Sequence, residues 1–454
     1  MKERIAILGG GESGTGAALL AKAKGHDVFV SDQGQLKDNY RNDLVQHAIE
    51  FEEGKHSEEK ILSAQWVIKS PGISDKSDIV KRVKAKRIPM MDEVEFAFRY
   101  LKGKVISITG TNGKTTTTLL VYHLLRTAGH KVALAGNVGE SLARKVSTGD
   151  FDWYVVELSS FQLDGTKTFH PHIGILLNIT PDHLDRYDNK MANYVNSKFR
   201  MIKNMGPKDY FIYYLDDPIA GKEARQRSTE AYRVELSMDP EAISSAHFDG
   251  KKLVFQFGKK KFKIGKDEST LRGNHNLINT MAAVSAAYLA KVPDTKIREG
   301  LKTFKNAPHR LEHIATINGV EFINDSKATN VDSVVYALGC YDKPVIWIAG
   351  GVDKGNDYSV IKKEVEKKVK TLICLGKDNA KLKKFFDNVV PSILETQDTK
   401  ELVRLALQSA KLGDVVLLSP ACASFDLFKN YEDRGNQFRE AVMLLKRDIE
   451  KVNG

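Results

Sequence analysis

Short apolar runs alternate with longer amphipathic stretches along most of the chain. The runs at residues 4–10 and 27–32 flank a stretch rich in small residues, 15–24, which is predicted to be a helix. Another apolar run, 66–70, stops at Pro71. Because a repeated order of strand, turn and helix produces parallel sheets covered by helices, the pattern predicts an α/β protein that opens with a Rossmann-like domain.

The alternation restarts twice further along the chain. The predicted strands of the second set lie at residues 104–110, 153–160 and 173–180, and a β-hairpin is predicted at 252–265. Those of the third set lie at 320–328, 345–351, 371–376 and 414–420. The breaks between the sets predict three domains, at 1–93, 94–305 and 306–454, with a P-loop domain in the centre and a second Rossmann-like domain at the end.

The composition of the chain indicates which broad classes of protein it fits, but it does not identify a function. Hydrophobic residues make up 42% of the 454, and the formal net charge is +11. The lysines are scattered, which favours a solvated surface over a nucleic-acid-binding face. The three cysteines lack metal-ligand spacing and fit a reducing compartment. No apolar run approaches the roughly 18 residues that cross a bilayer, so we expect a cytoplasmic protein without membrane insertion, and a monomer by default.

The most specific motif is ITGTNGKTTTTLL, which joins a strand that ends at Gly110 to a helix that begins near Lys114. Its glycines allow backbone N–H groups to wrap an anion, and the helix N-terminus adds partial positive charge. Lys114 can neutralise the β- and γ-phosphates of ATP, and the Thr115 hydroxyl can bind Mg²⁺. The generic P-loop has a further glycine where this chain has Ile108, yet the combined signal predicts phosphate binding.

A nucleotide site of this kind needs a metal partner, and carboxylates stand at the ends of two predicted strands. Glu157 ends one of them, and Asp182, His183 and Asp185 follow the next. The carboxyl ends of parallel strands meet at the edge of the sheet where ligands bind. For His183 the residues leave two interpretations open, a metal ligand and a structural hydrogen-bonding group.

The first domain carries a second phosphate-binding pattern. Gly9, Gly11 and Gly14 form G-x-G-x-x-G between a strand and a helix, and Asp32 ends the next strand. This arrangement is typical of dinucleotide binding, so an NAD-dependent oxidoreductase is one interpretation. Any nucleotide diphosphate could use the same turn, and an ATP-consuming enzyme acting on a nucleotide-linked substrate would need both motifs.

Polar groups also follow the strands of the third set. The strings APHRLEH, NDSKATN, AGGVDKGND and SPACASFDLFKNYEDRG supply His309, Arg310, Lys327 and Lys354. All but the first follow an apolar strand, so these groups are expected at one sheet edge. A cluster of cations suits a phosphate or a carboxylate.

Several of these strings occur together in one known family. GTNGKTT, GNVG, ELSSFQL, NITPDHLDRY, HRLE, NDSKATN and SPACASFDLF resemble the Mur ligases of peptidoglycan synthesis, over essentially the whole chain. NDSKATN and SPACASFDLF favour the branch that adds D-glutamate, and the D-N-P-R motif of the diaminopimelate-adding branch does not occur in the sequence.

The resemblance implies a three-domain enzyme with one substrate assigned to each domain. The first domain would hold UDP-N-acetylmuramoyl-L-alanine, the second ATP, and the third D-glutamate. ATP would phosphorylate the L-alanyl carboxylate, and the D-glutamate amine would then attack the acyl phosphate. The expected partners are therefore small molecules, with two Mg²⁺ ions and no nucleic acid.

The resemblance also assigns roles residue by residue. Lys114, Glu157, His183 and Lys198 are the expected catalytic set, with Thr115, Glu157, His183 and Lys198 as metal ligands if Lys198 is carbamylated. ATP-binding roles fall on Gly110, Thr111, Asn112, Gly113, Lys114, Thr115, Thr116, Asn276, Asn279, Arg310 and Asp325. The UDP-linked substrate is assigned to Ser13, Asp32, Gln33, Gly72, Asn137, Ser159 and His183. D-glutamate is assigned to Lys327, Thr329, Lys354, Ser424 and Phe425.

Three other functions stay open from the sequence. An NAD oxidoreductase would leave Lys114 and Thr115 without a role. A folylpolyglutamate synthetase would share the P-loop but would not explain SPACASFDLF. A DNA-binding ATPase would use the +11 charge and would bind with a steep salt dependence.

Overall fold

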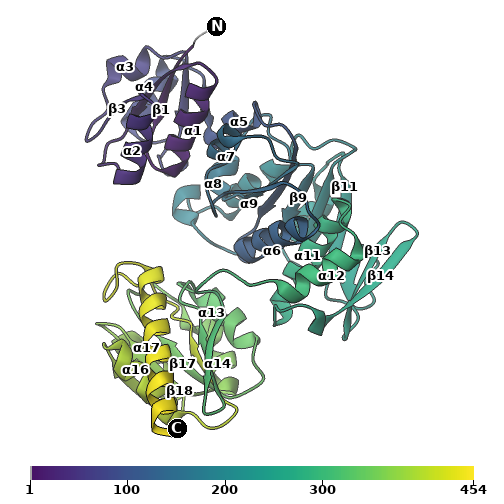
Figure 1. Cartoon of the computed structure of the whole chain (residues 1–454), viewed down its shortest axis with the longest axis vertical. Helices are drawn as coiled ribbons and strands as arrows, with labels where there is room; N and C mark the ends of the chain where they lie inside the picture. The colour runs from purple at the N-terminus through teal and green to yellow at the C-terminus, as the bar shows by residue number, and fades with distance from the viewer. Residues whose placement is uncertain (1–2, 454) are drawn as a thin grey trace. The chain divides into compact units, whose positions relative to one another are not determined.

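The computed structural model describes residues 3–453, and its strands form three separate sheets flanked by helices (Figure 1). The residues group into two compact units. One contains the chain up to residue 270 together with 278–304, and the other contains 271–277 and the chain from 305 onward. The first two sheets lie in the first unit and the third sheet lies in the second. The domain boundaries at 94 and 305 stay predictions.

The first sheet is parallel and has five strands in the order β3-β2-β1-β4-β5. Its strands are β1 (Arg4–Leu8), β2 (Asp27–Ser31), β3 (Glu50–Glu52), β4 (Trp66–Lys69) and β5 (Met90–Asp92), and its helices are α1 (Glu12–Ala23), α2 (Asp38–Gln46), α3 (Glu58–Leu62), α4 (Asp78–Ala85) and α5 (Glu93–Phe98). The helix expected at 15–24 begins at Glu12. The Thr15 N–H donates to the Gly11 carbonyl at 2.8 Å, so the glycine motif itself forms the first helical turn.

The second sheet has nine strands in the order β14-β13-β12-β11-β10-β9-β6-β8-β7. Its strands are β6 (Lys104–Thr109), β7 (Val132–Gly136), β8 (Trp153–Glu157), β9 (Ile173–Leu176), β10 (Tyr210–Tyr214), β11 (Tyr232–Ser237), β12 (Ala246–Phe248), β13 (Lys252–Phe257) and β14 (Lys260–Gly265). Strands β13 and β14 pair antiparallel, which confirms the hairpin predicted at 252–265. The helices of this part are α6 (Lys114–Thr127), α7 (Leu142–Thr148), α8 (Ser160–Asp164), α9 (Met191–Phe199), α10 (Ala220–Gln226), α11 (Asn274–Leu289) and α12 (Asp294–Thr303).

The third sheet has six strands in the order β15-β16-β20-β17-β18-β19. Its strands are β15 (Glu312–Ile317), β16 (Val320–Asn324), β17 (Val345–Ala349), β18 (Val369–Leu375), β19 (Ile393–Thr396) and β20 (Val415–Leu418), and its helices are α13 (Val331–Gly339), α14 (Lys362–Lys368), α15 (Ala380–Phe386), α16 (Thr399–Ser409) and α17 (Tyr431–Asn453). Strand β15 was not predicted, because it is an antiparallel edge strand with several polar, partly exposed residues.

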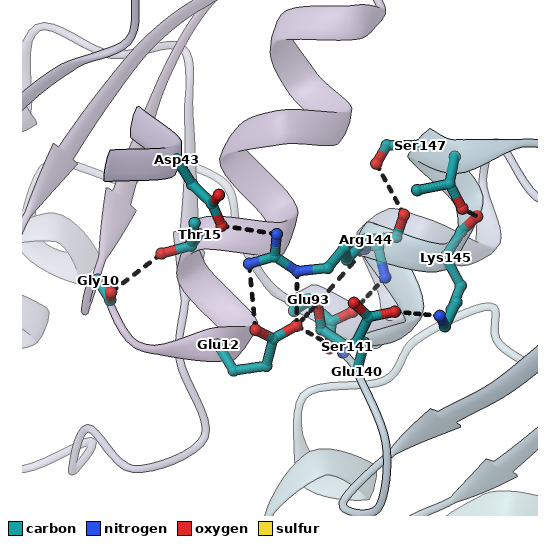
Figure 2. A network of polar contacts seen from close by, with 12 residues as sticks. Gly10, Glu12, Thr15, Asp43, Glu93, Glu140, Ser141, Arg144, Lys145 and Ser147 are labelled. Atoms are coloured by element: carbon teal, nitrogen blue, oxygen red, sulfur yellow. Dashed lines mark hydrogen bonds and ion pairs between the residues drawn. The ribbon is translucent and has the colours of Figure 1, made fainter. Parts of the chain in front are cut away.

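Helix α1 of the first sheet packs on α7 of the second, and a polar network joins them (Figure 2). The Arg144 guanidinium donates to both carboxylate oxygens of Glu12, at 2.9 and 3.1 Å, and to the Asp43 carboxylate at 2.7 Å. The Ser141 N–H donates to Glu12 at 2.8 Å, and the Ala143 N–H donates to Glu93 at 2.6 Å. These bonds satisfy N–H groups at the start of α7 and hold the glycine turn of the first sheet against it.

Candidate active site

The first strand ends in a tight glycine turn. Gly9 has a φ angle of +88°, and a Cβ atom at Gly14 would lie 1.7 Å from the Gly9 carbonyl oxygen, so both positions require glycine. The Asp32 carboxylate accepts hydrogen bonds from the N–H groups of Gly10 and Gly34, each at 2.7 Å. Asp32 therefore stabilises the conformation of the turn through these two hydrogen bonds.

The P-loop connects β6 to α6. Gly110 and Gly113 have φ angles of +150° and +83°, which favour glycine. The Lys114 ammonium donates to the carbonyl oxygens of Gly110 at 2.9 Å and Thr111 at 2.7 Å. The cation thus lies over the loop whose backbone N–H groups are expected to bind phosphate.

Glu157 is buried at the end of β8, beside the strand that leads into the P-loop. Its side chain Oε1 accepts a hydrogen bond from Asn137 Nδ2 at 3.0 Å, whereas the buried Oε2 has no hydrogen-bond partner among the described residues. A buried carboxylate oxygen without a partner is costly unless a cation or donor arrives. Together with the buried hydroxyl group of Thr115 at the start of α6, Glu157 fits the oxygen ligands that Mg²⁺ prefers.

Lys198 lies on α9 with only 2% of its surface exposed. Its ammonium donates to the Gly110 carbonyl at 2.8 Å and lies 4.7 Å from the centre of the Tyr194 ring. Burial, and then the nearby charge of Lys114, lower the pKa of Lys198 well below its ordinary value. Loss of the proton gives the neutral amine, which is the form that reacts with carbon dioxide.

His183 differs from the other predicted metal ligands because its side chain is 55% exposed. Its ring lies against Phe161, with 5.2 Å between the ring centres. Across residues 3–453, no three His, Cys, Asp or Glu side chains converge as a metal cluster. The residues therefore fit an ion held partly by substrate phosphates, as is usual for Mg²⁺, better than an ion enclosed by protein alone.

One cavity of about 770 Å³ in the first unit brings several of the predicted groups together, although Thr115 and Glu157 are not in its lining. Its lining includes Lys114 and Lys198 from the P-loop region and, from the predicted substrate set, Ser13, Asp32, Gly72, Asn137, Ser159 and His183. Gln33 is exposed and does not line it. The cavity therefore connects the glycine turn of the first sheet with the P-loop of the second.

In the second unit, Asp325 directly follows β16. Its carboxylate accepts hydrogen bonds from the Ser419 hydroxyl at 3.0 Å and the Leu311 N–H at 3.2 Å. Burial raises its pKa to about 7, and the nearby Arg310 opposes that rise. The Nε atom of Arg310 is buried without a hydrogen-bond partner among the described residues, so the guanidinium has a donor left for a ligand.

The residues predicted for D-glutamate follow three neighbouring strands. Lys327 and Thr329 come after β16, Lys354 after β17, and Ser424 and Phe425 after β20. In the sheet, β20 lies between β16 and β17. Lys354 and Phe425 are exposed, whereas Ser424 is buried. The parallel topology thus places all five predicted residues at one edge of the third sheet.

The two asparagines predicted for the nucleotide base lie on α11. Both side chains are buried. Asn276 Nδ2 donates to the Arg272 carbonyl at 2.8 Å, and Asn279 lies against Gly113, where an added Cβ atom would come within 2.4 Å of its Oδ1. Asn279 is therefore next to the P-loop, and its role toward the base stays a prediction.

Comparison with known proteins identifies the family. Three family models match in order: the MurD N-terminal domain at residues 4–79, the Mur ligase middle domain at 108–287 and the Mur ligase glutamate ligase domain at 309–422. A UDP-N-acetylmuramoylalanine–D-glutamate ligase from Cytophaga hutchinsonii is 50% identical over 98% of this chain and 100% of its own length. Those of Bacteroides fragilis and Porphyromonas gingivalis are 48% and 49% identical, over 97% and 98% of this chain and 99% of their own. The chain belongs to the Mur ligase family.

Solved structures of Mur ligases share the fold. A pseudomurein peptide ligase type C from Methanothermus fervidus and the UDP-N-acetylmuramate-alanine ligase from Thermotoga maritima each superpose with a TM-score of 0.63, over 98% of this chain and 100% of theirs. Their identities are 19% and 18%, so the likeness concerns the fold. It confirms the predicted three-domain α/β architecture.

In this Mur ligase the structure also shows cavity residues that the sequence interpretation missed. They are Glu12, Tyr40, Ser70, Pro71, Gly136, Gly139, Ser160, Phe161, Gln162 and Tyr194. Two examples show that some of them lay within recognisable patterns. Glu12 lies inside the glycine motif, and Gln162 forms a capping box in which its Oε1 accepts from the Ser159 N–H at 3.0 Å.

The chain contains no helix, within the described 3–453, that is long and apolar enough to cross a membrane.

Proposed function

We propose that this Mur ligase joins the L-alanyl carboxylate of UDP-N-acetylmuramoyl-L-alanine to the amine of D-glutamate, and that it converts ATP to ADP and phosphate. The observation that carries the proposal is the cavity of about 770 Å³, in which the glycine turn and Lys114 line one space. A UDP-linked substrate lying there would present its diphosphate to the turn and its carboxylate toward the P-loop. The names of the relatives support D-glutamate as the second substrate.

In the first step, an oxygen of the L-alanyl carboxylate attacks the γ-phosphorus of ATP, and ADP leaves. Both reactants are anions, so their approach requires neutralised charge. The Lys114 ammonium supplies one positive charge at the P-loop, and Arg310 is proposed to supply another at the γ-phosphate. Asn137, bonded to Glu157, and Ser159 are proposed to orient the muramoyl-alanine arm.

In the second step, the D-glutamate amine attacks the acyl carbon and loses a proton, and inorganic phosphate leaves. Lys327, Thr329, Lys354, Ser424 and Phe425 are proposed to hold the amino acid. Two cations among these groups suit the two carboxylates of glutamate. Exclusion of water protects the acyl phosphate from hydrolysis until the amine arrives.

Two Mg²⁺ ions are proposed to bind with ATP, held by Thr115, Glu157, His183 and carbamylated Lys198. When bound, they would neutralise phosphate charge and orient the γ-phosphate. The unpartnered Oε2 of Glu157 and the burial of Lys198 support this set. Carbamylation joins the neutral Lys198 amine to carbon dioxide and releases one proton, so the neutral amine becomes a metal-binding anion.

Phosphate release tests the proposed reaction. We expect release with Mg-ATP only when UDP-N-acetylmuramoyl-L-alanine and D-glutamate are both present, together with a product whose mass includes glutamate. Equal turnover with L-glutamate or D-alanine would contradict the specificity. Binding of NADH, seen as a fluorescence change, would favour an oxidoreductase instead.

A Lys198→Ala variant tests the carbamate. Loss of a metal ligand should lower kcat at least about 100-fold. A ¹³C carbamate signal should appear in wild-type protein grown or incubated with ¹³C-bicarbonate and be missing from the variant. Lys203→Ala, which changes an exposed lysine nearby, is the control. Full activity of Lys198→Ala at ambient bicarbonate would refute the carbamate.

A monomeric state and a cytoplasmic location are also proposed. Light scattering coupled to size-exclusion chromatography, run with and without substrates, tests the first. Fractionation of the source cells tests the second.

A further inference from the structure

A buried arginine lies beneath the predicted D-glutamate loops of the second unit. Arg434 is in the first turn of α17, and only 1% of its surface is exposed. Two general effects oppose a cation at this position. Burial removes the guanidinium from water, and the N-terminus of a helix is the positive end of its dipole. Burial lowers the pKa of Arg434 to about 10.

The hydrogen bonds of Arg434 reach the backbone of three different loops. Its Nε donates to the Ser326 hydroxyl at 3.0 Å and its Nη2 to the Ser326 carbonyl at 2.9 Å. Its Nη1 donates to the Cys422 carbonyl at 3.2 Å and to the Gly350 carbonyl at 3.4 Å. The loops therefore follow β16, β20 and β17, the three adjacent strands of the sheet.

Each of these loops carries part of the proposed D-glutamate site. Lys327 comes directly after Ser326, Lys354 follows Gly350 in the next loop, and Ser424 follows Cys422 in the third. One planar guanidinium thus fixes the starting points of all three loops, which a flexible ammonium with a single point of charge could not do.

The oxygen atoms that accept from Arg434 are carbonyl and hydroxyl groups, not carboxylates. Asp426 attracts the guanidinium electrostatically, but its carboxylate accepts instead from the Lys377 N–H at 3.0 Å. Among the described residues no carboxylate accepts a hydrogen bond from the guanidinium, so its positive charge at this sheet edge is not cancelled by a hydrogen-bonded ion pair. A dicarboxylate bound there would benefit from it.

We propose that Arg434 is a positioning residue for the incoming acidic amino acid. It fixes the three loops that hold D-glutamate, and its buried charge strengthens the attraction for the two carboxylates. This inference rests on the proposed function and adds to it a residue that does not touch the substrate. Asp325, which is predicted to bind ATP, precedes Ser326 but has its own hydrogen bonds to Ser419 and Leu311. Substitution of Arg434 should therefore affect ATP binding much less than D-glutamate binding.

The test compares Arg434→Gln, Arg434→Lys and a matched control, Phe438→Leu. Phe438 is fully buried one turn further along α17 and packs in the core, without bonds to the loops. For Arg434→Gln we expect the KM for D-glutamate to rise about 30-fold, which is about 2 kcal/mol at 1.4 kcal/mol per tenfold. Arg434→Lys keeps the charge and should raise it about tenfold. The KM values for ATP and for the UDP-linked substrate should change less than about twofold in both.

Phe438→Leu should lower the melting temperature and leave the KM for D-glutamate unchanged. A D-glutamate KM that is unchanged in both Arg434 variants overturns the inference. So does an equal rise in all three KM values, because that result indicates general loss of structure. If Arg434→Gln does not fold, Arg434→Lys decides between the same outcomes.

The wild-type protein is measured first, so that the two proposals fail separately. If it releases no phosphate in response to D-glutamate, the proposed function is wrong and this inference falls with it. If it does release phosphate and the Arg434 variants retain the wild-type KM for D-glutamate, the proposed function stands and the inference alone is wrong.

Discussion

Removal of the Arg144 side chain should weaken the connection between the first two sheets. Arg144 bonds to Glu12 and Asp43 through three N–H···O contacts of 2.7 to 3.1 Å, and its side chain is 13% exposed (Figure 2). The side chains of its partners are more accessible, at 29% and 31%. Exposed ion pairs contribute about 0–1 kcal/mol, and breaking a buried pair costs about 3–5 kcal/mol. We therefore expect Arg144→Ala to lower the free energy of unfolding by about 2–3 kcal/mol.

A double-mutant cycle isolates the part that belongs to Glu12. Wild type, Glu12→Gln, Arg144→Ala and the double variant are unfolded in urea, and the transition is followed by tryptophan fluorescence. Because two of the three contacts end on Glu12, a coupling energy of about 1.5 kcal/mol is expected. The KM for the UDP-linked substrate should rise as well, since Glu12 lines the cavity.

The control is Lys81→Ala, which breaks an exposed pair with Asp78 whose side chains are 62% and 86% accessible. It should cost less than about 0.5 kcal/mol. A coupling energy between Glu12 and Arg144 below about 0.3 kcal/mol would refute the reasoning, because the two changes would then be independent.

Three further predictions concern other parts of the first unit. Glu93 is fully buried, and burial raises its pKa to about 8. The native state therefore binds this proton more tightly than the unfolded state, and the free energy of unfolding should fall as the pH rises from about 4.5 to 8. Glu93→Gln keeps the acceptor for the Ala143 N–H and should flatten this fall in urea unfolding curves measured at pH 5 and pH 8. Gly14→Ala should lower both the melting temperature and the affinity for the UDP-linked substrate in calorimetry, because its Cβ would lie 1.7 Å from the Gly9 carbonyl oxygen. The control is Gly25→Ala, where a Cβ atom has open space but the φ angle is +84°; this variant should lower the melting temperature without changing the affinity. Glu157→Gln should lower kcat at least about tenfold and raise the Mg²⁺ concentration needed for half-maximal rate, and an unchanged Mg²⁺ dependence would contradict its role as a ligand.

Local pattern was sufficient for much of the architecture. The apolar runs predicted β1, β2 and β4 of the first sheet, β6, β8 and β9 of the second, and β16, β17, β18 and β20 of the third, because strands buried on both faces contain continuous apolar residues. They did not predict β10 and β11, although β10 lies in the middle of the second sheet. The edge strand β15 was missed because polar residues alternate along it. The start of α1 was placed too late because glycines lower helix propensity, although here Gly14 is required by its contact with Gly9.

In the candidate site, too, some features were predictable from the sequence and others depend on tertiary packing. Lys114 and Glu157 were predicted from short strings, because phosphate and metal chemistry demands particular groups near strand ends. Lys198 and Asp325 were predicted only from the resemblance to the Mur ligases. Their properties came from packing. Nothing in the string around Lys198 indicates that its ammonium is buried against the Gly110 carbonyl, and nothing around Glu157 indicates that one oxygen lacks a partner.

By itself the sequence determined the α/β class, many of the strands and helices, the two glycine turns and the family, since each of these depends on residues that are close together in the chain. Only the tertiary structure decided that Glu12 and Arg144 are paired across two sheets and that Arg434 joins three loops. Such contacts link residues about a hundred positions apart, as in Arg434 and Ser326, which are 108 apart. They depend on which strands become neighbours in a sheet, and the pattern of apolar and polar residues within one segment does not specify that order.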